Sequence, residues 1–339
     1  MKNDPVDRPS KGEASHDAGG ARDAGRRVLL LFPGALGDAV CLEPAAAHLA
    51  AQGELVLYAR GAAAEVAALY PARPRVCSLD APEIARLFAP GEDDPELARW
   101  LAGFARVVSF TGAGVPEVAR RLGALPDATL APFPRPPLER HAADHFLGVV
   151  CGDPAATAPP PRLVAPAEGR PPASGGGARL VLLPGSGGRD KRAAPELFLE
   201  VARRWRDAGG EVTVVLGPAE AAEDAAWVAA GRVVRPGSVA ELAAVLARSA
   251  AFVGNDAGPS HVAAALGVAG AVLYRSTSPA SFGPRGEDVA AIDVQAHDAT
   301  VSAVWDAIGR RVVGERDGKC AAPSTPSPPT PRDNRQDDE

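Results

Sequence analysis

The feature that most constrains the fold is an alternation, repeated in both halves of the chain, of short β-rich runs and Ala- and Leu-rich stretches suited to helices. In the first half the runs are 28–32, 54–59 and 106–110, and the alternation restarts at 180–183. Strands that alternate with helical stretches are typical of βαβ units and a parallel sheet. The sequence therefore predicts an α/β protein with two Rossmann-like, doubly wound domains.

The second half carries this pattern more clearly. A helix is expected over 195–206, where Leu197, Phe198, Val201 and Trp205 share one face, and Gly209 and Gly210 end it. The further expected elements are strand 212–216, a helix from about Ala219, helix 239–249, strand 251–254, helix 259–266 and strand 271–274. Ligands of such folds bind at the carboxyl ends of the strands, so the loops there are the informative ones.

Length and composition divide the chain further. Its 339 residues suit two domains, and 46% apolar with 23% charged residues is close to the globular average. Polar, Pro- and Gly-rich segments separate the parts. We predict a disordered tail over 1–25, an N-terminal Rossmann-like domain over 26–150, a linker over 151–178, a C-terminal Rossmann-like domain over 179–313 and a disordered tail over 314–339.

Charge and cysteine content exclude several classes of protein. A net charge of −6 with scattered arginines gives no broad basic face for nucleic acid. The four cysteines lie far apart, which predicts reduced thiols and neither a zinc motif nor a disulfide framework. The start is polar and no apolar run could span a bilayer, so a cytoplasmic protein is expected. A lipid substrate would require peripheral contact with the inner membrane, through basic residues such as Arg120, Arg121, Arg135 and Arg140.

The first strand leads into a glycine-bearing turn that contains Gly34, Gly37 and Asp38. Glycines allow close approach of backbone to a ligand, and Asp38 is placed at a helix start facing the cleft. Asp38 could equally serve only as a helix cap. Pro44 falls inside the expected helix, which either kinks there or becomes regular only from Pro44. The glycine spacing is not the dinucleotide fingerprint, and the second strand ends at Arg60 instead of an acid, so an NAD enzyme is disfavoured.

A second glycine-rich loop, 184–191, contains Ser186 and ends at Lys191. Asp190 stands where a Walker A motif requires glycine, so the loop is not a P-loop of that kind. Its successive amides can still hold a phosphate, with Lys191 adding a point charge. The alternative is a solvated lysine on a flexible loop.

The strongest single signal is the loop 254–261, in which Pro259 opens a helix at its favoured first position. The helix start offers free amides and a positive dipole end, which suit a diphosphate without a metal. His261 alone would more often be a packed histidine. Glu220 follows a strand at another helix start, where it could hold ribose hydroxyls or merely favour the dipole.

Taken together, these loops resemble glycosyltransferase family 9, the heptosyltransferases of the lipopolysaccharide inner core. The segments that carry the resemblance are 34–38, 217–220 and 254–267, within a similarity that covers roughly 27–294. The resemblance implies a GT-B fold and an inverting, metal-independent reaction without a cofactor. It also implies a nucleoside-diphosphate-sugar substrate, usually ADP-heptose, and a glycan or lipid-linked acceptor.

The resemblance also implies roles for individual residues. Asp38 matches the acidic residue at the acceptor site, which we predict to be the general base. The donor-binding residues it implies are Lys191 near the phosphates, Glu220 at the ribose, and Asp256, Ala257, Gly258, Ser260 and His261 in the sugar and diphosphate loop. Gly34, Gly37 and Ser186 belong to the acceptor and phosphate loops.

Three positions depart from the usual family pattern. Ala193 replaces a common aromatic residue, Ala257 a common hydroxyl and Ser278 a common acid. Two alternatives therefore stay open beside the transferase: a GT-B sugar-nucleotide epimerase that turns over a nucleotide-sugar alone, and a degenerate member that binds a nucleotide or a partner without catalysis.

Overall fold

The structure is a computed structural model that describes residues 25–91, 94–166, 178–217 and 227–311. Nearly all of both expected tails, the second part of the expected linker and the start of the helix expected from Ala219 lie outside these ranges.

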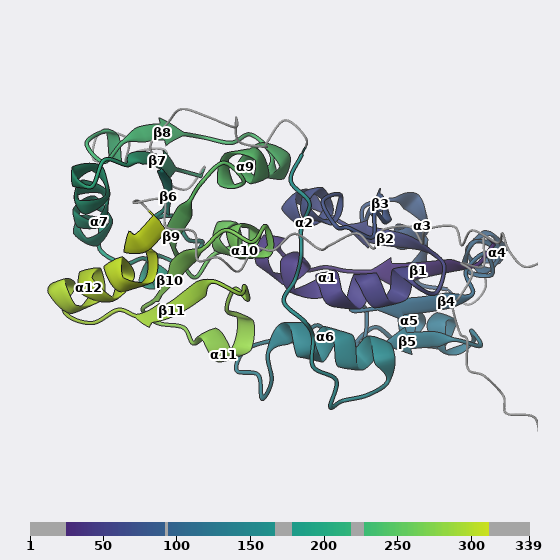
Figure 1. The fold of residues 1–339 in the computed structure, drawn as a ribbon. Coiled ribbons are helices and arrows are strands. Elements are labelled where there is room, and N and C mark those ends of the chain that lie inside the picture. Colours follow the sequence, from purple (N-terminus) through teal and green to yellow (C-terminus); the bar gives the residue numbers. More distant parts are fainter. Residues whose placement is uncertain (1–24, 92–93, 167–177, 218–226, 312–339) are drawn as a thin grey trace, which may run out of the picture.

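Two parallel sheets form the frame of the molecule (Figure 1). The first has the order β3-β2-β1-β4-β5 and the second the order β11-β10-β9-β6-β7-β8. Their strands are β1 (Arg27–Leu31), β2 (Glu54–Ala59), β3 (Arg75–Ser78), β4 (Arg106–Ser109), β5 (Ala128–Leu130), β6 (Arg179–Leu183), β7 (Glu211–Val215), β8 (Arg232–Val234), β9 (Ala251–Asn255), β10 (Gly270–Tyr274) and β11 (Val289–Asp293). The prediction of two Rossmann-like domains in a GT-B arrangement is confirmed.

Helices cover both faces of the first sheet because its central strand is apolar on both sides. Val28 and Leu30 of β1 pack in one cluster, and Leu29 and Leu31 in another. The helices of the first cluster are α1 (Leu36–Ala50), α2 (Gly61–Ala67) and α6 (Ala142–Cys151), and those of the second are α3 (Pro82–Phe88), α4 (Pro95–Leu101) and α5 (Pro116–Gly123).

The second sheet is covered in the same way. Val181 and Leu183 of β6 face one cluster, and Leu180 and Leu182 face another. The helices on the first side are α9 (Val239–Leu246) and α10 (Gly258–Ala265), and those on the second are α7 (Pro195–Asp207) and α12 (His297–Ile308). The short α11 (Pro279–Phe282) follows β10 at the edge of the cleft.

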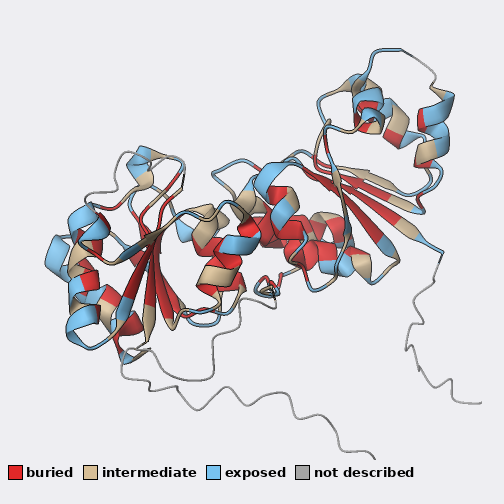
Figure 2. Ribbon diagram, turned by 90° about the horizontal axis from the view of Figure 1, so that it is seen from above, coloured by how far each residue is buried: buried red, intermediate tan, exposed pale blue. Residues whose placement is uncertain are grey.

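The inner helices of both domains share one apolar cluster, which lies between the two sheets (Figure 2). Val40 of α1 and Val262 of α10 both belong to it. The two helices come close at Gly258, where an added Cβ would lie 2.8 Å from the Leu36 side chain. The domains are therefore held together by a core that continues across their interface.

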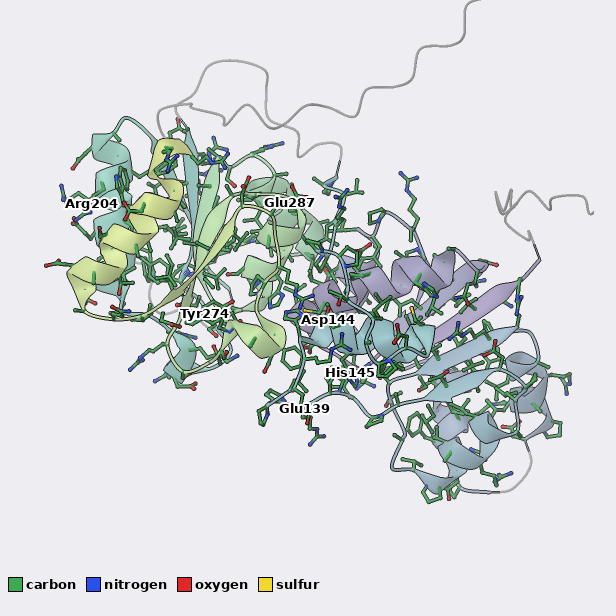
Figure 3. The ribbon with its side chains drawn as sticks, turned by 60° about the horizontal axis from the view of Figure 1, so that its bottom comes forward. Glu139, Asp144, His145, Arg204, Tyr274 and Glu287 are labelled. Atoms are coloured by element: carbon green, nitrogen blue, oxygen red, sulfur yellow. The ribbon has the colours of Figure 1, made fainter. Side chains whose placement is uncertain are left out.

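Polar contacts reinforce this interface on the α6 side. Arg285, after α11, donates two hydrogen bonds of 2.8 Å to the Asp144 carboxylate on α6, where the two domains meet (Figure 3). His141 accepts from the Ala143 amide through Nδ1, so its Nε2 donates to the Gly283 carbonyl at 2.8 Å. Partial burial disfavours the charge of Asp144, but Arg285 and the Ala158 amide hold its pKa below the ordinary value.

The described part of the expected linker, 152–166, forms no helix or strand and contacts both domains. The Leu163 amide donates to the Ala265 carbonyl and the Val164 amide to the Leu69 carbonyl, each at 2.9 Å. The boundaries given above remain our proposal for the domain division.

Pro44 does not delay the start of α1, since the helix is continuous from Leu36 through Pro44 to Ala50. The expectation that its regular part begins only at Pro44 is therefore wrong. Proline lacks the amide that would complete the preceding turn. The missing amide is the one that would bond the Val40 carbonyl, and the Tyr70 hydroxyl donates to the neighbouring Ala39 carbonyl.

Candidate active site

Asp38 caps its own helix and also faces the cleft. Its Oδ2 accepts a hydrogen bond of 2.8 Å from the Ala35 amide, so the interpretation of Asp38 as a helix cap is correct. The same residue also lines the cavity between the domains. Burial raises the pKa of Asp38, although the Ala35 amide and the charge of Lys191 oppose the shift. A carboxylate made more basic in this way remains suited to accepting a proton.

The glycine-rich loop after β6 is fixed by a buried asparagine from β9. Asn255 accepts from the Ala193 amide at 2.9 Å and donates to the Pro184 carbonyl at 2.7 Å. Arg192 adds hydrogen bonds of 3.0 and 3.2 Å to the Ser186 carbonyl. Both ends of the loop are thus tied to the sheet, which is the opposite of a loosely held, flexible segment.

Lys191 lies in an ionic and hydrogen-bonded group with Asp256 and Thr277. Its Nζ is 3.4 Å from Asp256 Oδ2, and the Thr277 hydroxyl donates to the same oxygen at 2.7 Å. The Asp256 side chain is buried, whereas that of Lys191 is 37% exposed. The lysine is therefore directed to one place and still open to a ligand.

The start of α10 offers fewer free amides than the motif suggested. Pro259 has no amide, and the amides of Ser260 and His261 donate to the Ala257 carbonyl at 3.0 and 3.4 Å. Within the described residues, no backbone carbonyl accepts from the amides of Ala257 or Gly258. The anion-binding capacity of this helix end thus comes from these two amides and the helix dipole.

His261 is buried against the other domain. An added Cβ at Gly37 would lie 3.0 Å from its ring, and its Nδ1 is 3.8 Å from Cys41 Sγ. Burial lowers the pKa of His261 to about 4, against the charge of Asp256, so the ring is neutral at neutral pH. Gly37 is needed because it lets α1 approach this ring.

One cavity of about 910 Å³ collects most of the predicted residues from both domains. Asp38 and Gly37 line it from the N-terminal domain, and Lys191 and His261 from the C-terminal domain. The remaining predicted residues on its lining are Ser186, Asp256, Ala257 and Gly258. We refer to it as the transfer cavity.

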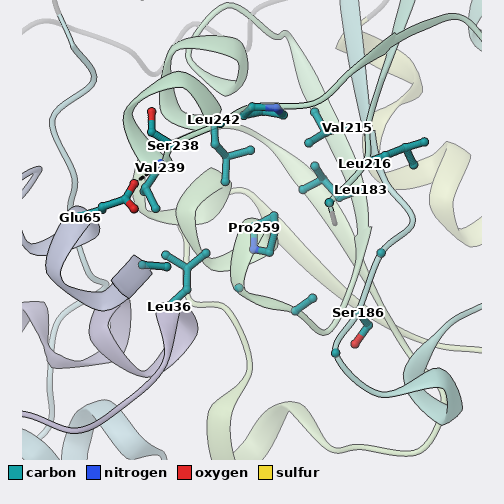
Figure 4. Close-up of a pocket in the computed structure, with 18 residues that line it drawn as sticks. Leu36, Glu65, Leu183, Ser186, Val215, Leu216, Ser238, Val239, Leu242 and Pro259 are labelled. Atoms are coloured by element: carbon teal, nitrogen blue, oxygen red, sulfur yellow. Dashed lines mark hydrogen bonds between the residues drawn. The ribbon is translucent and has the colours of Figure 1, made fainter. Parts of the chain in front are cut away.

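A second cavity of about 430 Å³ opens beside the carboxyl ends of β6 and β7 (Figure 4). Its walls are mainly apolar, with Leu183, Val215 and Leu242 among them. The N-terminal domain contributes Leu36, Ala62 and Glu65. We refer to it as the side cavity. Both cavities are lined by Ser186, Gly187, Ala257 and Gly258, so they meet at the phosphate loop and the start of α10.

Two predicted residues, Ser260 and Gly34, do not line the transfer cavity, and Glu220 lies outside the described residues. Ser260 is fully buried and its hydroxyl donates to the Asn255 carbonyl at 2.7 Å. Gly34 lies behind Asp38, where an added Cβ would meet the Phe32 ring at 2.5 Å. Glu220 lies outside the described residues, although Gly217 before it lines the side cavity.

The four arginines suggested for membrane contact differ in their local contacts, and Arg120 donates to the Gly91 carbonyl at 3.0 Å. Arg121 donates to the backbone carbonyls of Arg86, Leu87 and Ala89, each at 2.8 or 2.9 Å, and so holds the end of α3. Arg140 binds the Ala156 carbonyl at 2.5 Å, whereas Arg135 lines the transfer cavity. No helix in the described ranges is long and apolar enough to cross a bilayer.

Sequence reasoning missed Asn255, the last residue of β9, and Thr277, which lies three residues after β10 ends. Their positions were the available signal, because parallel strands bring such side chains to one edge. It also missed Glu65 and the segment 133–137, which line the two cavities from the N-terminal domain. Among the described residues, no group of three His, Cys, Asp or Glu side chains is arranged to hold a metal ion.

The two parallel-sheet domains define a GT-B fold, and solved structures agree on it. The family 9 glycosyltransferase from Veillonella parvula gives a TM-score of 0.67 at 17% identity, covering 87% of this chain and 99% of that one. E. coli ADP-heptose lipopolysaccharide heptosyltransferase II gives a TM-score of 0.66 at 17% identity, covering 85% of this chain and 99% of that one. The E. coli heptosyltransferase WaaC with ADP gives a TM-score of 0.59 at 18% identity, covering 84% of this chain and 99% of that one.

Residues 167–303 match the family model described as glycosyltransferase family 9 (heptosyltransferase). This match confirms the predicted resemblance, and it contains two of the three segments that carry it, 217–220 and 254–267, but not 34–38. No curated protein matches the chain. The match and the shared fold indicate a glycosyltransferase whose residues 167–303 are similar to the heptosyltransferases.

Proposed function

We propose that the protein transfers a heptose from ADP-heptose to a glycan of the lipopolysaccharide core, with inversion at the anomeric carbon and without a metal. The observation that carries the proposal is the junction of the two cavities at Ser186, Gly187, Ala257 and Gly258. A nucleoside in the apolar side cavity would place its diphosphate at this junction and its sugar in the transfer cavity. A WaaC structure with ADP-2-deoxy-2-fluoro heptose, 19% identical to this chain, supports the choice of donor.

Asp38 is the general base in this proposal. It faces the transfer cavity from the N-terminal domain, whereas the phosphate-binding groups face it from the C-terminal domain. The acceptor hydroxyl attacks the anomeric carbon from the side opposite the diphosphate and gives its proton to the Asp38 carboxylate. The bond between that carbon and the diphosphate breaks, and ADP leaves.

Lys191 and the amides of Ala257 and Gly258 stabilise the charge that develops on the leaving diphosphate. Lys191 already lies beside Asp256 and Thr277, so it is oriented before a ligand arrives. Neutral His261 and Asp256 lie at the sugar side of the same cavity. We propose a cytoplasmic reaction, with peripheral contact at the inner membrane where the acceptor is lipid-linked.

The test is ADP release from ADP-heptose by the full chain, with and without a heptose-free core oligosaccharide, in EDTA. Release that requires the acceptor, together with an inverted product, is the expected result. Conversion of ADP-heptose alone into another nucleotide-sugar would favour an epimerase. Tight ADP binding without any turnover would favour a binding protein.

A further inference from the structure

Glu65 is the one charged side chain among the described residues that line the side cavity. It comes from α2 of the N-terminal domain, while most of the cavity belongs to the C-terminal domain. Its Oε2 accepts a hydrogen bond of 2.7 Å from the Val239 amide, at the start of α9. Glu65 thus joins the domains at the wall of this cavity and is held in place there.

Glu65 lies at the end of the side cavity away from Ser186, where the proposed function places the diphosphate. Ser186, at the junction with the transfer cavity, is on the opposite side of the side cavity from Glu65 and Ser238 (Figure 4). The walls between them include Leu183, Val215 and Pro259. With a diphosphate at the junction, the flat apolar nucleobase would lie between these walls, and its polar edge would point to the Glu65 end.

A carboxylate can only accept hydrogen bonds, and one oxygen of Glu65 is already bound to Val239. The second oxygen suits a nucleobase that offers an amino group. At position 6 a 6-aminopurine presents such a donor, whereas a 6-oxopurine presents a carbonyl that the carboxylate repels and keeps a donor only at N1.

We propose that Glu65 determines the nucleobase of the donor by accepting a hydrogen bond from the amino group of a 6-aminopurine. Because Glu65 belongs to the N-terminal domain, base recognition also ties the nucleotide to the domain interface. This inference rests on the proposed function, since it assumes that the side cavity holds the nucleoside.

The experiment measures the dissociation constants of ADP and IDP, which differ only at this edge of the base, by titration calorimetry on the full chain. Wild type is expected to bind ADP about tenfold or more tightly than IDP, the scale of a hydrogen bond to a charged group. In Glu65→Gln the ratio should fall to one or below, because the amide group left to face the base can only donate. The amide oxygen can still accept from Val239, which preserves the interdomain contact.

Two further variants separate recognition from structure. Glu65→Lys replaces an acceptor with a donor, and it should reverse the preference towards IDP. Glu196→Gln makes the same charge change at an exposed position in the first turn of α7, outside both cavities, and should keep the wild-type ratio.

Equal affinity of wild type for ADP and IDP, or an unchanged ratio in Glu65→Gln, would overturn the inference and leave the proposed function standing. Failure of wild type to bind either nucleotide would instead contradict the proposed function, and the inference with it.

Discussion

The two walls of the transfer cavity differ in how firmly they are held. On the C-terminal side, Asn255 fixes both ends of the phosphate loop, and Thr277 and Asp256 orient Lys191. On the N-terminal side, Asp38 has a single hydrogen bond among the described residues, to its own helix start. A binding site for a fixed anion gains from rigid donors, whereas a base must change protonation at each turnover.

We therefore assign donor binding to the C-terminal wall and proton transfer to the N-terminal wall. Changes on the C-terminal wall should therefore affect affinity and stability, and a change at Asp38 should affect turnover alone. The following variants test this separation.

Asp38→Asn should lower kcat by roughly a hundredfold or more, the usual scale for a lost general base. The amide oxygen can still accept from Ala35, so the helix cap and the affinity for ADP should change little. Initial rates with ADP-heptose and calorimetry with ADP measure the two effects. A variant with unimpaired turnover would remove Asp38 from the reaction, and one with equally weakened ADP binding would break the comparison.

Asn255→Ala should lower the free energy of unfolding by about 2 kcal/mol, because it leaves the Ala193 amide and the Pro184 carbonyl without their buried partner. Urea unfolding followed by tryptophan fluorescence measures the loss. ADP affinity should fall as well, since the phosphate loop loses its anchor. A variant as stable as wild type would show that the loop is held by other contacts.

Lys191→Ala should weaken ADP binding by about tenfold, through loss of a charge-assisted contact with phosphate. The control is Arg189→Ala, which removes the same charge two residues away at an exposed position that does not line either cavity. Calorimetry in EDTA gives both constants. Equal affinity in wild type and Lys191→Ala would exclude the lysine from the phosphate site.

Because of His261, the free energy of unfolding should be lower in mild acid than at neutral pH. Its folded pKa is about 4, below its ordinary value of 6.5, so between these pH values the unfolded chain binds a proton that the folded chain does not. The free energy of unfolding should fall as pH drops through this window, by at most about 1.4 kcal/mol per pH unit from this group. His261→Asn should have a shallower slope in urea unfolding at several pH values, and an identical slope would contradict the assignment.

Much of this fold was predictable from the sequence because parallel, buried strands are nearly continuous apolar runs. The strands at 54–59, 180–183 and 251–254 were predicted to within about one residue. The strand β11 and the helix α12 were missed, because β11 is mostly exposed or half-buried and lacks a strong apolar signal.

The site was predictable only where its residues share a local motif. Asp38, Lys191, Asp256 and His261 each lie in a glycine-bearing loop after a strand or in the first residues of the helix that follows it, and the structure brings them to one cavity. Glu65 has no local signal, since it is one acid on a short helix of the other domain. Its position at the side cavity follows from the packing of the two domains, which cannot be read from a short stretch of sequence.

The most direct test of the account is the melting temperature of the purified chain with ADP, GDP, CDP or UDP, each in magnesium and in EDTA. The account predicts a shift that is largest with ADP and is the same in EDTA, because Lys191 and the amides of Ala257 and Gly258 hold the diphosphate. At a hundredfold excess over the dissociation constant, the stabilisation should be about 2.7 kcal/mol. No shift with any nucleotide, or a shift abolished by EDTA, would contradict it.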